Sequence, residues 1–187
     1  QLNDQMRATV RNGLEAAVSD PLTGLHNRRY AMPHLDRIAR RAHETERPFA
    51  VMIVDMDHFK RINDTYGHAA GDAVLVEVAR RLRENLRAVD LIARIGGEEF
   101  LIVLPSAPLI NAQNAARRLC KLIGETLFLM PNGGKPIKAT ISIGLAIGGT
   151  AGKDIKTAHQ LLDEADKALY DAKMRGRNCV KLSRPAA

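Results

Sequence analysis

The segment LIARIGGEEFLIVL, residues 91–104, decides the fold of this chain. Its two apolar runs, 91–95 and 100–104, are separated by Gly96-Gly97. A glycine pair can adopt the positive φ angles that a tight hairpin turn needs, so the segment predicts a β-hairpin. Because the strands of a hairpin run antiparallel, the sheet that contains them has an antiparallel part.

Helices and further strands are predicted on both sides of this hairpin. The run FAVMIV at 49–54 is short and wholly apolar, as expected for a fully buried strand. Apolar residues recur at helical spacing in four further segments, and an alternating strand pattern occupies IKATISIGLAIG, 137–148. The predicted helices are 33–45, with Pro33 at the first helical position, a helix from Asp72 to about Leu86, 112–123 and 158–174. This order predicts an α+β fold, in which a central, mostly antiparallel sheet is wrapped by helices.

The first eighteen residues differ from the rest. They place Leu2, Met6, Val10 and Leu14 four apart, which predicts a short helix with one apolar stripe and no core of its own. Ser19-Asp20-Pro21 then ends this helix, because proline disfavours helix in the preceding residue and supplies no N–H. We therefore expect a connector helix at 1–18 and a compact domain at 19–187. Because the first residue is Gln1, we also expect a missing upstream region.

The composition narrows the class of protein. The 187 residues, 45% of them hydrophobic, fit one globular domain plus a short appendage, and no apolar run approaches the roughly 18 residues that cross a bilayer. Cys120 and Cys179 form no CxxC pair, which argues against a disulfide framework or a zinc site and indicates a reducing, cytoplasmic compartment. The net charge of +7 favours a polyanionic partner. Nucleic acid is disfavoured as that partner, because four Phe, three Tyr and no Trp give few side chains to stack on bases.

Acidic residues gather at the ends of two predicted strands. Asp55 and Asp57 follow the buried strand, and Glu98 and Glu99 follow the glycine pair. Mg²⁺ prefers oxygen ligands and usually takes one or two carboxylates together with substrate phosphates, so these acids fit a nucleotide site. Spacing alone leaves open the alternative that all four are solvated turn residues.

Two other binding loops are excluded by single residues. An EF-hand fails because Phe59 and Lys60 stand where the loop needs an oxygen ligand and then glycine. A P-loop fails because Gly134-Lys135 is followed by Pro136 and not by Ser or Thr. Zincin and serine-hydrolase signatures do not occur either.

Four separated motifs carry a resemblance to a known family. The chain resembles the GGDEF-family diguanylate cyclases, here with a GGEEF variant, in the order and spacing of DPLTGLHNRR (20–29), VDMDHFKRINDTYGHAAGD (54–72), RIGGEEF (94–100) and YDAKMRGRN (170–178). The resemblance spans residues 20–182, and several motifs in agreement are a far stronger signal than any one of them. It implies that 19–187 is a catalytic domain with a fold similar to the palm of nucleotide cyclases and polymerases. The implied reaction is condensation of two GTP into cyclic di-GMP with loss of two pyrophosphates.

The resemblance also implies partners. These are GTP as substrate, cyclic di-GMP as product and inhibitor, a second copy of the chain in a homodimer, and an upstream sensor or receiver domain. It implies cytoplasmic catalysis without membrane contact by these residues, and it is compatible with a membrane tether upstream. Two alternatives stay open: a catalytically silent domain that binds GTP or cyclic di-GMP as a sensor, and a cyclase that acts on a single triphosphate. The intact acids argue against the silent domain.

Metal ligands are assigned by the same resemblance. It places them on Asp55, the backbone carbonyl of Met56, and the acids Glu98 and Glu99. Two Mg²⁺ ions per site, with Mn²⁺ as an alternative, would polarise the α-phosphate and help to deprotonate the 3′-hydroxyl. We expect Glu98 to be a ligand. Whether Glu98 or Glu99 is the general base stays open, because successive side chains of a strand point to opposite faces.

Phosphate-binding residues come from two of the motifs. The resemblance implies that Lys60 and the backbone N–H groups of His58 and Phe59 hold the terminal phosphates at a helix start, where free donors and the helix dipole favour anions. Lys173 and Arg177 are expected to assist. Without the family match, Lys60 would be interpreted as a solvated lysine.

Guanine recognition and product inhibition complete the implied site. Asn63 and Asp72 resemble guanine readers, since a carboxylate accepts from the N1–H and N2 amine that adenine does not present in that pattern, and His68 lies between them. The segment Arg87-Ala88-Val89-Asp90 is predicted to end the helix that begins near Asp72, and it resembles the RxxD product-inhibition site of the family. Arg117 or Arg118 of a neighbouring domain is a further candidate for that site. The alternative is an exposed ion pair of little energetic weight.

Overall fold

A six-stranded sheet forms the centre of the protein in the computed structural model, which describes residues 2–149 and 155–184. The strands lie in the order β1-β3-β4-β2-β5-β6. Their bounds are β1 His26–Asn27, β2 Phe49–Met56, β3 Leu91–Arg94, β4 Glu99–Leu104, β5 Ile141–Gly148 and β6 Val180–Leu182. The four inner strands pair antiparallel, which confirms the predicted hairpin and the mostly antiparallel sheet. Both short edge strands are parallel to their neighbours, so the sheet is mixed.

Helices cover both faces of the sheet. Their bounds are α1 Leu2–Val18, α2 Arg28–Thr45, α3 Phe59–Tyr66, α4 His68–Glu84, α5 Leu109–Glu125 and α6 Ala158–Met174. Alternate residues of β2 enter two different cores, as the two-residue period of a strand requires. Ala50, Met52 and Val54 pack with α3, α4 and α5, whereas Phe49, Val51 and Ile53 pack with α2 and α6. This burial on both faces explains why the strand is apolar throughout.

Helix α6 lies very close to β5. A Cβ atom built on Gly144 would collide with the backbone of Ala165 and Leu169 in α6, so only glycine fits at that position. The predicted bounds of this helix, 158–174, agree with the structure. Its first turn is closed by a capping box between Thr157 and Gln160. The close packing fixes the C-terminal end of α6 beside the end of β2.

Three predicted boundaries are wrong. Helix α2 begins at Arg28, five residues before Pro33, because the side chain of Asn27 accepts a hydrogen bond from Tyr30 N and caps the helix there. Helix α4 begins at His68 and ends at Glu84, so Arg87–Asp90 lie in the following turn and not at a helix end. Strand β5 begins at Ile141 and is buried on both faces, since α5 and α6 cover it.

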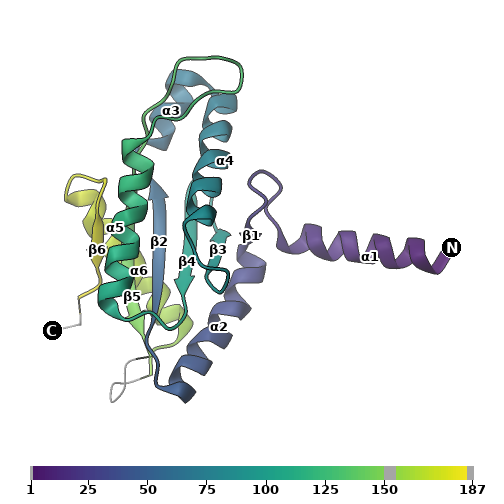
Figure 1. Cartoon of the computed structure of the whole chain (residues 1–187), viewed down its shortest axis with the longest axis vertical. Helices are drawn as coiled ribbons and strands as arrows, with labels where there is room; N and C mark the ends of the chain where they lie inside the picture. The colour runs from purple at the N-terminus through teal and green to yellow at the C-terminus, as the bar shows by residue number, and fades with distance from the viewer. Residues whose placement is uncertain (1, 150–154, 185–187) are drawn as a thin grey trace.

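Helix α1 projects away from the rest of the molecule (Figure 1). None of its residues is buried, and the stripe Leu2, Met6, Val10 and Leu14 is 60–75% exposed. The predicted division into a connector and a domain stays a prediction. In the described ranges, no helix is both long and apolar enough to cross a membrane.

Candidate active site

The ends of β2 and β4 bring the predicted acids together. Asp55 is paired with Glu99 in the antiparallel register, and the N–H of Met56 donates to the carbonyl of Glu98 at 3.2 Å. The tight turn that precedes β4 is closed by hydrogen bonds from the N–H groups of Ile95 and Gly96 to the carbonyl of Glu99. Glu98 lies in this turn and Glu99 is the first residue of the strand. The turn therefore places Glu98 beside the carboxyl end of β2.

The pKa values of the two glutamates are raised. Burial raises the pKa of Glu98 first, and the adjacent charge of Asp55 raises it further. Burial also raises the pKa of Glu99, with contributions from the charges of Asp166 and Asp55. Arg28 opposes the rise at Glu99. The acids thus form a half-buried cluster in which negative charges repel one another.

Lys173, at the end of α6, reaches into this cluster. Its ammonium donates to Asp55 Oδ1 at 2.9 Å, to the carbonyl of Met56 at 3.3 Å and to Asp57 Oδ1 at 3.1 Å. The side chain of Lys173 is 21% exposed and that of Asp55 is 18% exposed, so the pair is partly shielded from solvent. The predicted phosphate-binding lysine therefore contacts two of the predicted metal-ligating residues.

Asp57 is fully buried and turned into the protein. Its carboxylate accepts hydrogen bonds from Ser142 Oγ at 2.6 Å, Thr140 Oγ1 at 2.7 Å and the N–H of Asn178 at 2.9 Å, besides the bond from Lys173. Burial by itself raises the pKa of Asp57, but these hydrogen bonds outweigh it and the pKa is lowered. Sequence analysis counted Asp57 among the clustered acids without giving it a role. Its partners are more than 80 residues away in sequence, and only the fold brings them together.

The oxygen set fits a hard divalent cation. Asp55, the Met56 carbonyl and Glu98 converge at one strand end, and a positively charged ammonium already contacts two of these groups. Oxygen donors of this kind suit Mg²⁺, which completes its coordination with water and substrate phosphates. Within 2–149 and 155–184, no group of three or more His, Cys, Asp and Glu side chains is arranged to hold a metal by itself.

The predicted phosphate-binding and guanine-binding residues other than Lys173 and Arg177 lie directly before α3, on α3 or on α4, beyond the carboxyl end of β2 (Figure 1). His58 adopts a left-handed conformation, φ 53°, immediately before α3, and Lys60 is exposed in its first turn. A Cβ atom on Gly71 would collide with Oδ1 of Asn63, so the two helices touch at this point. Asp72 follows in sequence and is exposed, as is His68. The structure thus places Asn63 close to the backbone beside Asp72.

Arg177 lies in the turn after α6. Gly176, Arg177 and Asn178 all have positive φ, and the N–H of Arg177 donates to the carbonyl of Ala172. The neighbouring bond from Asn178 to Asp57 attaches this turn to the end of β2. Arg177 is exposed, and it follows Lys173 by four residues in the sequence. The cation-bearing end of α6 and its turn are therefore held to the sheet through Asp57.

The RxxD segment lies directly before β3, at the end of that strand opposite the glycine turn. Asp90 accepts from the backbone N–H of Arg87 at 2.7 Å and from its guanidinium at 2.8 Å, and Arg87 also donates to the carbonyl of Pro105. A hollow of about 280 Å³ opens here, and His26, Arg83 and Ile92 contribute to its lining. Arg118 donates to the carbonyl of Asn85 within the same chain.

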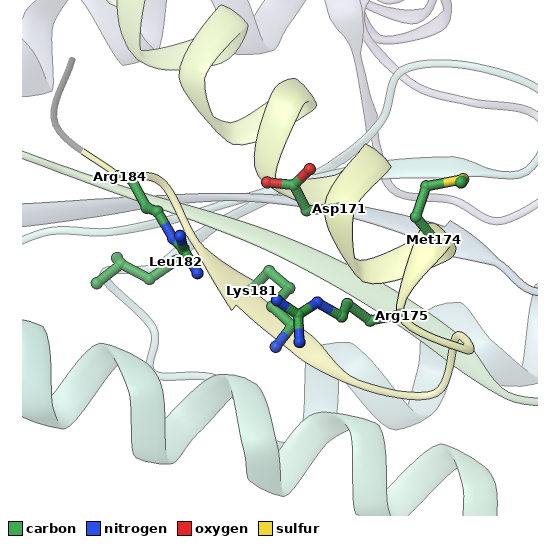
Figure 2. Close-up of a pocket in the computed structure, with 6 residues that line it drawn as sticks. All are labelled: Asp171, Met174, Arg175, Lys181, Leu182 and Arg184. Atoms are coloured by element: carbon green, nitrogen blue, oxygen red, sulfur yellow. The ribbon is translucent and has the colours of Figure 1, made fainter. Parts of the chain in front are cut away.

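A second hollow, of about 270 Å³, contains none of the predicted site residues (Figure 2). It lies between the end of α6 and β6, on the helix face opposite Lys173, as the helical spacing of its residues requires. Its lining consists of Asp171, Met174, Arg175, Lys181, Leu182 and Arg184.

Two further arginines interact with acids near the site. Arg94 pairs with Asp20, the acid of the first motif, at 3.1 Å, so this pair joins the segment after α1 to the strand before the glycine turn. The charge of Arg28 acts on Glu99 and Asp166. The spacing of the motifs gave no signal for Asp166.

The sequence and the fold of this chain are similar to those of known proteins. The family model for the diguanylate cyclase GGDEF domain matches residues 17–179. The response regulator PleD of Caulobacter vibrioides is 44% identical over 177 residues, covering 95% of this chain and 38% of PleD. A crystal structure of the coiled coil and GGDEF domain of DgcB from Caulobacter crescentus, in complex with c-di-GMP, superposes with a TM-score of 0.88 at 28% identity, covering 96% of this chain and 92% of that one.

A third similar protein is described by the same motif, GGEEF. The active GGEEF domain of a diguanylate cyclase from Vibrio cholerae superposes with a TM-score of 0.76 at 28% identity. The match covers 86% of this chain and 98% of that one. By contrast, the chain spans about two fifths of the length of PleD.

Proposed function

The chain belongs to the GGDEF family of diguanylate cyclase domains, and we propose on this basis that it condenses two GTP into cyclic di-GMP. The observation that carries the proposal is the convergence of Asp55, the Met56 carbonyl and Glu98 beside Lys173. This arrangement offers carboxylates for a cation and an ammonium for phosphate at one place. The motif residues that the family would use are all present in the sequence.

The proposed chemistry joins two nucleotides. The 3′-hydroxyl of one GTP attacks the α-phosphorus of the other, its proton passes to a carboxylate, and the bond to pyrophosphate breaks. Repeating the step in the opposite sense closes the ring. Glu98 and Glu99 are the candidates for the base, since both have raised pKa values and a base with a pKa nearer neutrality transfers protons more effectively.

A divalent cation would be held by Asp55, the Met56 carbonyl, Glu98 and Glu99. Mg²⁺, with Mn²⁺ as an alternative, supplies polarisation of the α-phosphate when bound. Lys60 and the N–H groups of His58 and Phe59 bind the terminal phosphates, with Lys173 and Arg177. Asn63 and Asp72 orient guanine, with His68 at the same helix junction.

Two copies of the domain are needed, because one site holds one GTP and the product contains two. We propose that the exposed stripe of α1 pairs two chains in a homodimer. We further propose that cyclic di-GMP inhibits the reaction by binding Arg87 and Asp90, away from the acids. The longer relatives suggest that an input domain lies upstream in the full protein.

One experiment tests the proposed activity. The protein is incubated with GTP and Mg²⁺, and the products are identified by chromatography and mass. We expect cyclic di-GMP and pyrophosphate from the parent chain and none from Asp55→Asn. The matched control is Asp36→Asn, an exposed acid on α2 whose side chain makes no hydrogen bond or ion pair with any described residue.

The other outcomes identify the alternatives. Binding of GTP without turnover would indicate a silent sensor domain, and a cyclic mononucleotide product would indicate a cyclase of single triphosphates. Either result contradicts the proposal.

A further inference from the structure

Lys173 contacts the same oxygen atoms that are proposed to hold the metal. Its ammonium lies 2.9 Å from Asp55 Oδ1 and 3.3 Å from the carbonyl oxygen of Met56. The charge of this ammonium therefore partly compensates the acid cluster. An ammonium and a divalent ion repel each other, so both cannot occupy this position together.

Lys173 has a second carboxylate that faces away from the metal position. Asp57 Oδ1 accepts from the ammonium at 3.1 Å, and its side chain is fully buried. Thr140, Ser142 and the N–H of Asn178 fix this carboxylate from three directions. Asp57 is thus immobilised by the protein itself, whereas Asp55 lies at the open end of the strand and is half-buried.

We propose that Lys173 is the resident cation of the ligand-free site, and that a divalent ion displaces it from Asp55 while Asp57 retains it. This inference rests on the proposed function, because it assumes that Asp55 and Met56 are metal ligands. Asp57 is then a positioning residue. It holds the ammonium within the site, so that the cation released from Asp55 stays available to the phosphates that enter with the metal.

The proposal makes opposite predictions for two neighbouring substitutions. Lys173→Met removes the competing cation at similar side-chain volume, so binding of Mn²⁺ without nucleotide should become about tenfold tighter, the size expected for losing one charge-assisted contact. Asp57→Asn removes the anchor, so the ammonium stays on Asp55 and Mn²⁺ binding should weaken. Lys60→Met, on α3, should leave Mn²⁺ binding unchanged although it weakens GTP binding.

The measurement is a titration of Mn²⁺ with each purified variant at pH 8, followed by electron paramagnetic resonance of the free ion. This pH is well above the usual pKa range of carboxyl groups. An affinity of Lys173→Met equal to or weaker than that of the parent would overturn the proposal. Misfolding cannot imitate the tighter binding expected of Lys173→Met, since an unfolded site loses affinity.

A second measurement uses the unaltered chain, and it decides the matter if Lys173→Met does not fold. Lysines of the parent protein are labelled with an amine-reactive acylating reagent, with and without Mn²⁺, and quantified by mass spectrometry. Labelling of Lys173 should rise severalfold with Mn²⁺, because the amine loses one of its two carboxylates, while Lys60 should not change. Equal labelling of Lys173 in both conditions contradicts the exchange.

Because no GTP is present, both readouts are independent of turnover. A parent that binds Mn²⁺ as expected but makes no cyclic di-GMP would refute the proposed activity alone.

Discussion

Replacing Asp57 by Asn should destabilise the domain by about 2–4 kcal/mol. Each carboxylate oxygen accepts two hydrogen bonds, Oδ1 from Ser142 and Lys173, and Oδ2 from Thr140 and Asn178. In the variant, one oxygen becomes an NH₂ group that faces two donors. A hydroxyl can rotate to accept, but the N–H of Asn178 or the ammonium of Lys173 cannot. Either the N–H of Asn178 loses its acceptor or the ammonium of Lys173 loses one of its three acceptors, at about 1–3 kcal/mol, and the remaining bonds lose their charge assistance.

Urea unfolding at pH 7 measures this loss. The midpoint should fall without a change in the slope, since the surface exposed on unfolding is the same. Ser142→Ala is the matched comparison, because it removes one donor and leaves the carboxylate with three, so it should cost only about 1 kcal/mol. Surface substitutions commonly change stability by about 0.5 kcal/mol. A free energy of unfolding for Asp57→Asn that lies within about 0.5 kcal/mol of the parent value would therefore refute the argument. The same holds if Asp57→Asn is more stable than Ser142→Ala.

The pH dependence gives an independent check on the same residue. Because the folded pKa of Asp57 is lowered, its contribution to stability is complete above the unfolded pKa of about 3.9. The contribution is lost as the pH falls below that value towards the folded pKa. The difference in stability between the parent and Asp57→Asn should therefore shrink in acid. A difference that stays constant from pH 7 down to pH 3 would show that the charge of Asp57 contributes nothing.

Three further predictions concern specificity, inhibition and assembly. ATP should be turned over up to about 10⁴-fold less efficiently than GTP, because the polar groups of Asn63 and Asp72 lose their partners on adenine, and comparable rates would remove the guanine assignment. Arg87→Ala should weaken inhibition by cyclic di-GMP about 10- to 150-fold with an unchanged initial rate, and identical inhibition curves would contradict the site. Leu14→Asp should lower the dimer fraction in sedimentation and the specific activity at low protein concentration, whereas Asn12→Asp, off the stripe, should change neither.

Long and strongly patterned elements could be predicted from the sequence. Helix α6 has its apolar residues at helical spacing and a capping box at its start, so local signals and packing agree on both of its ends. Strand β2 and the hairpin were predicted for the same reason. Edge strands β1 and β6 have two and three residues, too few for any period to be visible. Their pairing with β3 and β5 is parallel, and it depends on how the segment before β1 and helix α6 before β6 are placed in the fold.

The predictions of helix boundaries were wrong where the local sequence supports more than one starting point. Pro33 suits a helix start, but Asn27 forms a hydrogen-bonded cap six residues earlier, and the helix continues through the proline. At α4, glycine and alanine between His68 and Asp72 gave no apolar period, so the first turn was missed. The segment Arg87–Asp90 was consequently assigned to a helix end, whereas Asp90 closes a turn of its own by accepting from the N–H of Arg87.

The two aspartates of the DMD sequence show why the site itself needed the fold. In a regular strand, Asp55 and Asp57 would point to the same face, which suggests one shared role. The strand ends at Met56, so Asp57 turns inward to donors supplied by β5 and by the turn after α6. Local sequence could not distinguish the acid that anchors the structure from the acid that faces the open site.

Among the described acids whose pKa is shifted, the direction of the shift separates two classes. Asp20, Asp57 and Glu77 have lowered pKa values, to about 2 for Glu77, because hydrogen bonds and cations of the chain itself satisfy them. Glu98, Glu99 and Asp166 have raised values, because burial and neighbouring acids outweigh Lys173 and Arg28. At a pH above the ordinary carboxyl pKa, acids with a lowered pKa therefore stabilise the folded state. Acids with a raised pKa destabilise it at the same pH.

A cluster that lowers the stability of its own fold at neutral pH is typical of a binding or catalytic site. Glu98→Gln should therefore remove activity and raise the thermal midpoint of the ligand-free protein at pH 8, because it removes a repelling charge beside Asp55. Differential scanning calorimetry measures the midpoint, and Glu84→Gln on the exposed end of α4 is the control that should not raise it. A lower midpoint for Glu98→Gln would mean that Glu98 is satisfied within the ligand-free protein, and the cation would then have no repulsion to relieve at this end of β2.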